Sequence, residues 1–153
     1  MGSRETEPAF AEFIRRAEQR LSFALAAAYG PDVGADATAE ALGFAWEHWD
    51  RLVTMENPVG YLYRVGQSRA RRYRRPRPPV CPPHPSPEPW VEPALPGALA
   101  RLSRRQRVAV VLVVGFGWYL AEVADLLGVC GSSVQRHLDR GLLKLRASLG
   151  VDE

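Results

Sequence analysis

Residues 120–138 read LAEVADLLGVCGSSVQRHL, and this stretch decides the fold expected for the second half of the chain. Apolar residues recur at helical spacing on both sides of a glycine, and Ala124 is small enough to let two helices approach closely. Gly128 can adopt the left-handed conformation that ends a first helix, and Ser132 or Ser133 can cap a second one. The stretch predicts a helix-turn-helix, with an ordinary helical hairpin as the alternative.

The second helix of this motif would present polar side chains away from its apolar side. These are Gln135, Arg136, His137 and Arg140. Gln pairs bidentately with adenine, and Arg with guanine, in the major groove of DNA. The start of the helix, at Ser132 and Ser133, can also receive a phosphate. We therefore predict that these six residues bind DNA. The alternative is that they only form the solvent-exposed face of an ordinary helix.

The segment before this motif holds a run of β-branched residues, Val108–Val114, that could form a buried strand. A capping box precedes it, because Ser103 is followed three residues later by Gln106. That box and the flanking arginines favour a buried helix ending near Gly115. A short helix around 94–101 is expected before it.

Further towards the N-terminus, the segment Pro76–Pro96 holds 10 of the 13 prolines of the chain. Proline lacks an amide donor and restricts the preceding residue, so neither helix nor sheet is expected there. An extended linker is the predicted state, and a proline-rich ligand for SH3-type domains is the alternative. The predicted organisation is all-α: two small helical domains, residues 1–75 and 97–153, joined by a Pro-rich linker at 76–96.

The first domain shows apolar residues at three- and four-residue spacing, which indicates helices. Gly30-Pro31 should stop the first helix, which carries Phe10 to Ala28 on its apolar side. A second helix should carry an apolar stripe from Ala41 to Leu52. Asn57-Pro58 has the pattern of a helix start, with Asn as the cap and Pro in the first turn. The third helix should run on into a cluster of arginines.

That cluster places six arginines and no acidic residue within residues 69–77, whereas residues 1–68 have a net charge of −4. Basic residues can follow a nucleic-acid backbone, and aromatic side chains such as Tyr61 and Tyr63 can stack on unpaired bases. The alternatives are a solvated charged helix end and a helix on a membrane surface. The predicted DNA-binding residues here are Tyr61, Arg64, Gln67, Ser68, Arg71, Arg72 and Arg75.

Sites for metals and catalysis are not indicated. Cys81 and His84, with Cys130 and His137, could form a zinc site, but their spacing is irregular for one. The histidines and cysteines also match no catalytic triad, so we expect no enzymatic activity, no metal and no cofactor. Without a transmembrane run or the apolar core of a signal peptide, the chain is expected to be cytoplasmic.

Three segments together resemble a known family. They are DATAEALGFAWEHWDRL (residues 36–52), ENPVGYLYRVGQSRARRYRR (56–75) and LARLSRRQRVAVVLVVGFGWYLAEVADLLGVCGSSVQRHLDRGLLKLRASL (99–149). In this order they are similar to region 2 and region 4 of the extracytoplasmic-function sigma factors of bacterial RNA polymerase. The resemblance covers nearly all of residues 10–149 except the linker.

The resemblance implies a function in promoter recognition and transcription initiation. Region 2 would bind the polymerase core through Asp36, Glu40 and Trp46. The helix over 56–75 would read and open the −10 element of promoter DNA, and the second helix of region 4 would read the −35 element. An anti-sigma factor is a further possible partner.

Two alternatives stay open at this point. A transcriptional regulator that does not bind polymerase would need only the helix-turn-helix, and it would leave the first 75 residues unexplained. A degenerate sigma-like protein could bind polymerase or an anti-sigma factor without starting transcription. The departures from the family's usual residues at Ser68, Arg72, Gln135 and His137 imply an unusual promoter preference.

Overall fold

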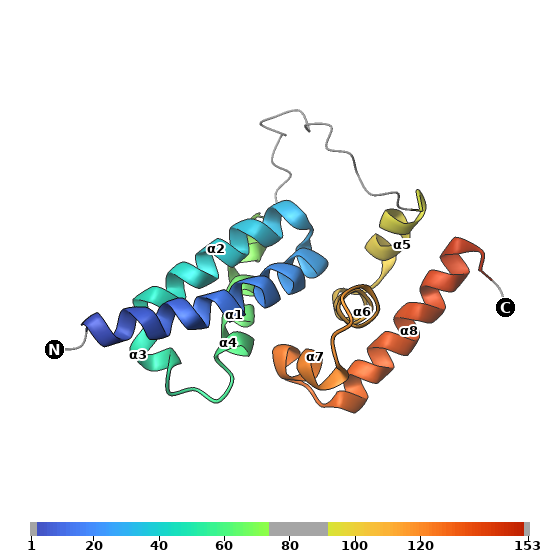
Figure 1. Cartoon of the computed structure of the whole chain (residues 1–153). Coiled ribbons are helices and arrows are strands. Elements are labelled where there is room, and N and C mark those ends of the chain that lie inside the picture. The colour runs from blue at the N-terminus through green and yellow to red at the C-terminus, as the bar shows by residue number, and fades with distance from the viewer. Residues whose placement is uncertain (1–2, 74–91, 152–153) are drawn as a thin grey trace.

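The computed structural model describes residues 3–73 (the first half below) and 92–151 (the second half). Within them, Figure 1 shows two groups of helices side by side. In chain order the elements are α1 (Ser3–Tyr29), α2 (Pro31–Glu47), α3 (Trp49–Leu52), α4 (Pro58–Ala70), the 3-10 turn η1 (Arg71–Tyr73), α5 (Leu95–Arg101), α6 (Arg104–Val110), the π-helical turn η2 (Val111–Gly115), α7 (Leu120–Leu127) and α8 (Gly131–Leu149). The predicted all-α class is confirmed. No helix in these ranges is long and apolar enough to cross a membrane.

Two long helices, α1 and α2, form the main hairpin of the first half. They meet at Gly30, whose φ of +89° is a conformation that other L-residues rarely adopt, and Pro31 opens α2. Gly34 lets the helices pass closely, because a Cβ there would lie 2.6 Å from the backbone of Ala26. The predicted end of the first helix at Gly30-Pro31 is therefore confirmed.

The second predicted helix is divided in two. It was expected to carry one apolar stripe as far as Leu52, but α2 ends at Glu47 and the single turn α3 follows. His48 lies between them, and its Nδ1 is 3.1 Å from the carbonyl oxygen of Phe44. The stripe itself is real, since Ala41, Ala45 and Leu52 are fully buried.

The helix α4 begins where the sequence predicts. The Asn57 side chain accepts a hydrogen bond of 2.9 Å from the Gly60 amide, and Pro58 is the first residue of the helix. The predicted extension through the arginine cluster is only partly observed. The α-helix ends at Ala70 and continues as one 3-10 turn through Arg71 and Arg72.

In the second half, the capping box before α6 is confirmed. Ser103 Oγ accepts from the Gln106 amide at 3.3 Å, and Gln106 Oε1 accepts from the Ser103 amide at 3.2 Å. The helix that follows buries Val108 and Leu112 completely and changes to π-helical geometry at its end. The buried-strand alternative for Val108–Val114 is therefore wrong.

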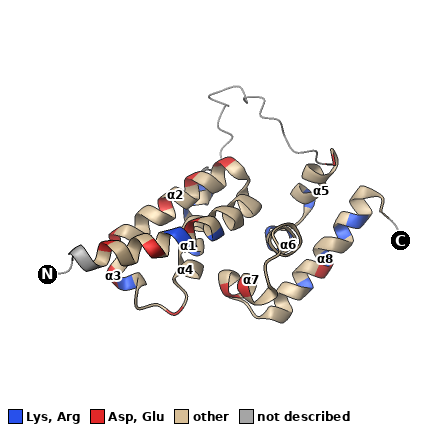
Figure 2. Ribbon diagram, viewed as in Figure 1, with Lys and Arg blue, Asp and Glu red and all other residues tan. Residues whose placement is uncertain are grey.

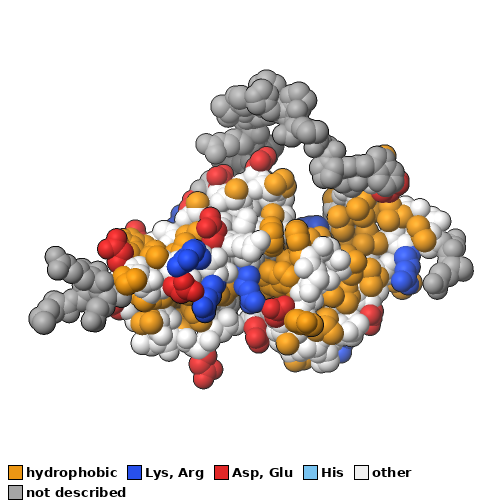
Figure 3. All heavy atoms as spheres, in the orientation of Figure 1, with side chains coloured by type: hydrophobic (Ala, Val, Ile, Leu, Met, Phe, Trp, Pro, Cys, Tyr) orange, Lys and Arg blue, Asp and Glu red, His pale blue; other side chains and the backbone are white. Residues whose placement is uncertain are grey.

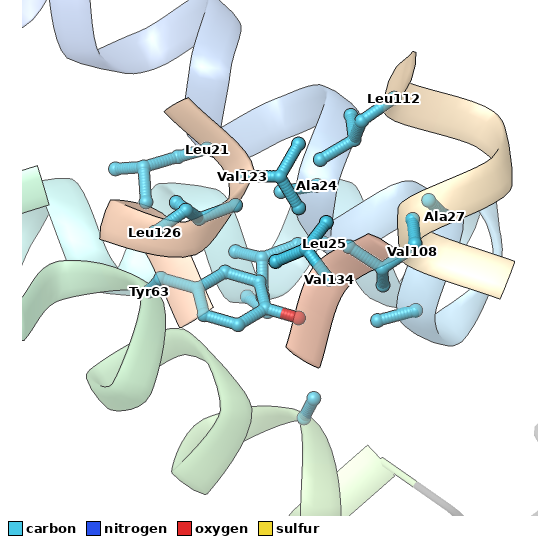
Figure 4. Close-up of a cluster of buried hydrophobic side chains, with 14 of the residues drawn as sticks. Leu21, Ala24, Leu25, Ala27, Tyr63, Val108, Leu112, Val123, Leu126 and Val134 are labelled. Carbon is cyan, nitrogen blue, oxygen red and sulfur yellow. The ribbon is translucent and has the colours of Figure 1, made fainter. Parts of the chain in front are cut away.

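The two halves share one hydrophobic core. Figure 4 shows Leu21, Leu25 and Tyr63 of the first half beside Val123, Leu126 and Val134 of the second. All of these side chains are at most 4% exposed. Because burial of such groups contributes roughly 25 cal/mol per Å² of apolar surface, the contact between the halves is a stabilising part of the fold.

Polar contacts also link the first half to the second half. The guanidinium of Arg107 on α6 donates to the carbonyl oxygens of Ala27 (2.7 Å) and Ala28 (2.6 Å) near the end of α1. On the other side, Asn57 Nδ2 donates to the carbonyl oxygen of Asp125 at 2.6 Å. Arg20 of α1 also pairs with Glu122 of α7 at 2.8 Å, so polar contacts join the halves at three places.

Candidate nucleic-acid interface

Helices α7 and α8 have the predicted helix-turn-helix geometry. Gly128 ends α7 with a φ of +67°, and the Val129 amide donates to the carbonyl oxygen of Ala124 at 3.1 Å. Val123 and Val134, one on each helix, are completely buried. The turn and these two buried side chains therefore set the angle between α7 and α8.

The predicted cap of α8 is wrong. The helix begins at Gly131 with Cys130 as its N-cap, and no side chain makes the capping hydrogen bond. Ser132 and Ser133 lie inside the first turn, where their Oγ atoms are 3.1 Å and 3.2 Å from Cys130 Sγ. Because these hydroxyls stabilise a thiolate, with Ser132 as the larger cause, they lower the pKa of Cys130 to about 7.

The polar side of α8 is open along its first half. Gln135, Arg136 and Arg140 are exposed, and the blue segments of α8 in Figure 2 mark Lys and Arg positions spaced along the helix. Gln135 Nε2 donates to Asp139 at 2.8 Å, which holds its amide on this face. The predicted base-reading side chains therefore lie together on the surface.

His137 differs from these neighbours because it is half-buried. Burial is the main cause that lowers its pKa, and the nearby guanidinium groups of Arg105 and Arg140 lower it further. The imidazole is therefore neutral at pH 7. The role of Arg105 in this cluster was missed by sequence reasoning, since nothing local indicates that the start of α6 meets α8.

The DNA-binding residues predicted on α4 are mostly accessible. Arg64, Ser68, Arg71 and Arg72 are exposed, and Gln67 is half-buried. Arg64 extends towards the helix-turn-helix, because its guanidinium would lie 3.8 Å from a Cβ placed on Gly128. Arg64 therefore lies beside the turn that joins α7 to α8. The predicted Arg75 lies outside the described residues, as do Cys81 and His84 of the zinc alternative.

The two tyrosines of α4 face the protein. Tyr61 is half-buried beside the Phe44 ring and has the Arg51 guanidinium 5.8 Å from its ring centre. Tyr63 is 1% exposed, and burial raises the pKa of its hydroxyl above the usual range. The expectation that Tyr63 stacks on an unpaired base is wrong for this arrangement of the halves.

The three residues predicted to bind polymerase all lie on α2. Asp36 is exposed, and Trp46 is 56% exposed with its ring edge-on to Phe10 at 4.8 Å. Glu40 is half-buried and forms an ion pair of 3.6 Å with Arg69 of α4. The helix thus offers one large exposed aromatic side chain and acidic groups to a partner.

The comparison with protein families matches only residues of the second half. Residues 94–145 match the family described as "Sigma-70, region 4". The match spans 52 of the 153 residues of the chain. The matched residues begin just before α5 and end inside α8, so they include α7, the turn at Gly128 and the exposed residues Gln135, Arg136 and Arg140.

Solved structures with the same fold extend the likeness to both halves. One is the sigma factor RpoE in complex with the anti-sigma factor NepR from Bartonella quintana, with a TM-score of 0.67, 21% identity, and coverage of 95% of this chain and 99% of that chain. Another is CnrH in complex with the cytosolic domain of CnrY, with a TM-score of 0.60, 23% identity, and coverage of 96% and 91%. No match is found among curated proteins.

Proposed function

We propose that this protein is a sigma factor of the extracytoplasmic-function type, which directs RNA polymerase to promoters and starts transcription. The observation that carries this proposal is the coincidence of region 4 with a formed helix-turn-helix whose second helix exposes Gln135, Arg136 and Arg140. The similarity of the whole chain to the fold of a sigma factor supports it.

In this proposal α8 enters the major groove of the −35 element. Arg136 and Gln135 read base edges, since Arg and Gln can each make two hydrogen bonds to one purine. Arg140, Ser132 and Ser133 contact phosphates, which set the register of the helix on the DNA. His137, being neutral, adds a hydrogen-bonding group but little attraction for phosphate.

The −10 element is assigned to α4 and the turn after it. Arg64, Arg71 and Arg72 attract the backbone of the opened strand, while Gln67 and Ser68 offer hydrogen-bonding groups to its bases. Tyr61 and Arg75 are retained in this proposal as further contacts. On α2, Asp36, Glu40 and Trp46 would bind the polymerase core.

The sigma factor family is not enzymatic, and we propose no catalytic residue in this chain. Because a protein that recognises promoters acts where the chromosome is, we propose that this protein is cytoplasmic. An anti-sigma factor is proposed as a further partner, since a protein of the same fold is known in complex with one.

Reading both elements at once requires the halves to separate. Elements about 25 base pairs apart lie roughly 85 Å from each other along the duplex, at about 3.4 Å per base pair. A packed chain of 153 residues has a radius of gyration near 15 Å, so it cannot reach both. Because Pro96 lies in α5, the predicted linker is shortened to the 19 residues Pro76–Ala94, which as a polyproline chain would span about 60 Å. We therefore propose 1–75 and 97–153 as units that part on the polymerase.

Transcription in a purified system tests the proposal. Core polymerase free of any sigma factor is mixed with the protein and genomic DNA fragments, and the transcripts are mapped. Promoter-specific start sites are expected only when the protein is present. DNA binding without such transcripts would instead favour a regulator that does not act through polymerase.

A further inference from the structure

Two buried hydroxyl groups have no hydrogen-bond partner within the described part of the protein. They belong to Tyr29, the last residue of α1, and to Tyr63 of α4. Every other buried side-chain nitrogen or oxygen atom that the structure describes has a partner. Since most buried polar side chains in folded proteins are hydrogen-bonded, these two hydroxyls need a physical explanation.

Both tyrosines lie at the boundary between the halves. Figure 4 shows Tyr63 in the cluster of buried side chains to which Leu25 of the first half and Val134 of the second half contribute. Tyr29 is covered from the second half, because the Arg104 guanidinium of α6 lies 4.6 Å from the centre of its ring. The bonds of Arg107 to the last turn of α1 hold α6 in this place.

The electrostatic surroundings of Tyr63 show that its hydroxyl lies near polar groups of both halves. Burial is the main cause that raises its pKa above the usual range, and the nearby Tyr29 raises the pKa further. Arg104 and Arg105 of α6 lower it, as does Gln67, one turn along α4. The Gln67 side chain nevertheless does not meet the Tyr63 hydroxyl in the geometry of a hydrogen bond. The hydroxyl therefore has polar neighbours but no bond to any of them.

The packed arrangement keeps bulk water away from both hydroxyls. Their oxygen atoms have almost no solvent-accessible surface. Figure 3 shows the two halves in direct contact on the face in view, with hydrophobic side chains on both sides of the boundary. Burying a hydroxyl that forms no hydrogen bond is unfavourable, since the bonds that it makes to water in the exposed state are lost. Each hydroxyl therefore opposes the packing of the halves.

We propose that Tyr29 and Tyr63 form a conformational switch that weakens the packed arrangement and keeps the two halves able to separate. Their rings stabilise the shared core while the halves are packed, whereas their hydroxyls regain hydrogen bonds to water only when the halves part. Phenylalanine at either position would supply the ring without the opposing effect of the hydroxyl. This inference rests on the proposed function, because the separated arrangement is the one assigned to promoter recognition.

A hydroxyl that is hydrogen-bonded in solution would have the opposite effect. If a buried water molecule or the other tyrosine accepted a hydrogen bond from it, replacement by phenylalanine would remove that bond and destabilise the packed arrangement. The sign of the change in stability therefore distinguishes a switch from an ordinary buried hydrogen bond.

Energy transfer between the halves of the full-length protein tests the switch without polymerase. Two dyes are attached at D50C in α3 and A147C in α8, both of which are exposed positions, in a protein that also carries C81S and C130S. Urea is added, and the midpoint for the loss of energy transfer is measured.

The variants compared in this labelled protein are Y29F, Y63F and the control Y61F. Tyr61 is half-buried on the same helix as Tyr63, and its hydroxyl is not one of the two buried hydroxyls without a partner. We expect Y29F and Y63F each to raise the urea midpoint by about 0.5–1 M, which corresponds to about a tenfold smaller equilibrium constant for separation. The midpoint of Y61F should stay within about 0.2 M of the parent value.

Binding to core polymerase in the absence of DNA is the second measurement, and Y29F is the variant of choice because Tyr29 lies outside every proposed binding site. Y29F should bind about tenfold more weakly than the parent protein, since a smaller fraction of it is separated. Unchanged or lower urea midpoints for Y29F and Y63F would overturn the switch. Higher midpoints with unchanged polymerase binding would also overturn it, because the hydroxyls would then affect folding and not separation. If the parent protein failed to bind core polymerase, the proposed function would fail, and the urea midpoints would still decide whether the hydroxyls oppose packing.

Discussion

At the scale of single residues, Arg136 is the side chain whose loss should be most informative about DNA reading. It is exposed on α8, so truncation does not disturb the core. Arg136→Ala should weaken binding to the cognate −35 sequence by about 1–3 kcal/mol and relax the preference at one base pair. Binding to a panel of single-base variants of the site measures both effects.

Arg146→Ala is the matched control, because Arg146 is also exposed on α8 but lies in its last turn. It should leave the base preference unchanged. If Arg136→Ala weakened binding equally for every sequence in the panel, Arg136 would be a phosphate contact and not a base reader.

Cys130 has a chemistry that depends on pH in the neutral range. Its pKa is lowered to about 7, so the thiolate is the minor form below pH 7 and the major form above it. The rate of alkylation by iodoacetamide should therefore rise with a midpoint near pH 7. Ser132→Ala removes the larger stabilising hydroxyl and should move this midpoint upwards. A midpoint near that of an ordinary thiol in both proteins would contradict the arrangement at the start of α8.

At the scale of elements, the turn between α7 and α8 depends on one glycine. Gly128 has a φ of +67°, and Gly128→Ala should lower the free energy of unfolding by about 1–2 kcal/mol, because a Cβ is unfavourable in the left-handed region. Gly131→Ala is the matched control: Gly131 is the first residue of α8, its φ is not positive, and a Cβ there would meet no atom within 4 Å. It should be neutral or stabilising by up to about 1 kcal/mol. Urea denaturation measures both, and equal losses would show that backbone conformation is not the cause.

Elements with a strong local signal were predictable from the sequence. The capping box of α6, the Asn57 start of α4 and the Gly128 turn each rest on residues within four positions of one another. The N-cap of α8 was misjudged because Cys130 is not an obvious capping residue while two serines follow it. The burial of Tyr63 was also missed, because it depends on helices more than 50 positions away in the chain.

The predicted site was foreseeable to the same extent. With 3.6 residues per turn, Val134 and Leu138 lie on one side of α8, and Gln135 and Arg136 lie on another. The exposed side of α8 can therefore be predicted from its own sequence. The effect of Arg105 on the pKa of His137 and the ion pair of Arg20 with Glu122 depend on how separate helices pack. No local pattern of residues indicates such contacts.

At the scale of the whole molecule, Arg107 is the polar group that links the halves most closely. Arg107→Ala removes its hydrogen bonds to the carbonyl oxygens of Ala27 and Ala28, at a cost of about 1.5–3 kcal/mol. We expect the halves to separate more often and the radius of gyration from small-angle X-ray scattering to rise. Arg101→Ala, at an exposed arginine of α5, should leave it unchanged. A lower melting temperature with no change in radius would mean that Arg107 stabilises the second half alone.

The position of Tyr63 has a consequence for how this protein can diversify. Its ring is buried in the core that the two halves share, although it is carried by the helix assigned to the −10 element. Mutational scanning would therefore score Tyr63 as a DNA contact when its loss is one of folding. Evolution meets the same constraint. New promoter preferences can arise at Ser68 and Arg72, which touch no core, whereas Tyr63 can change only together with the residues that enclose it.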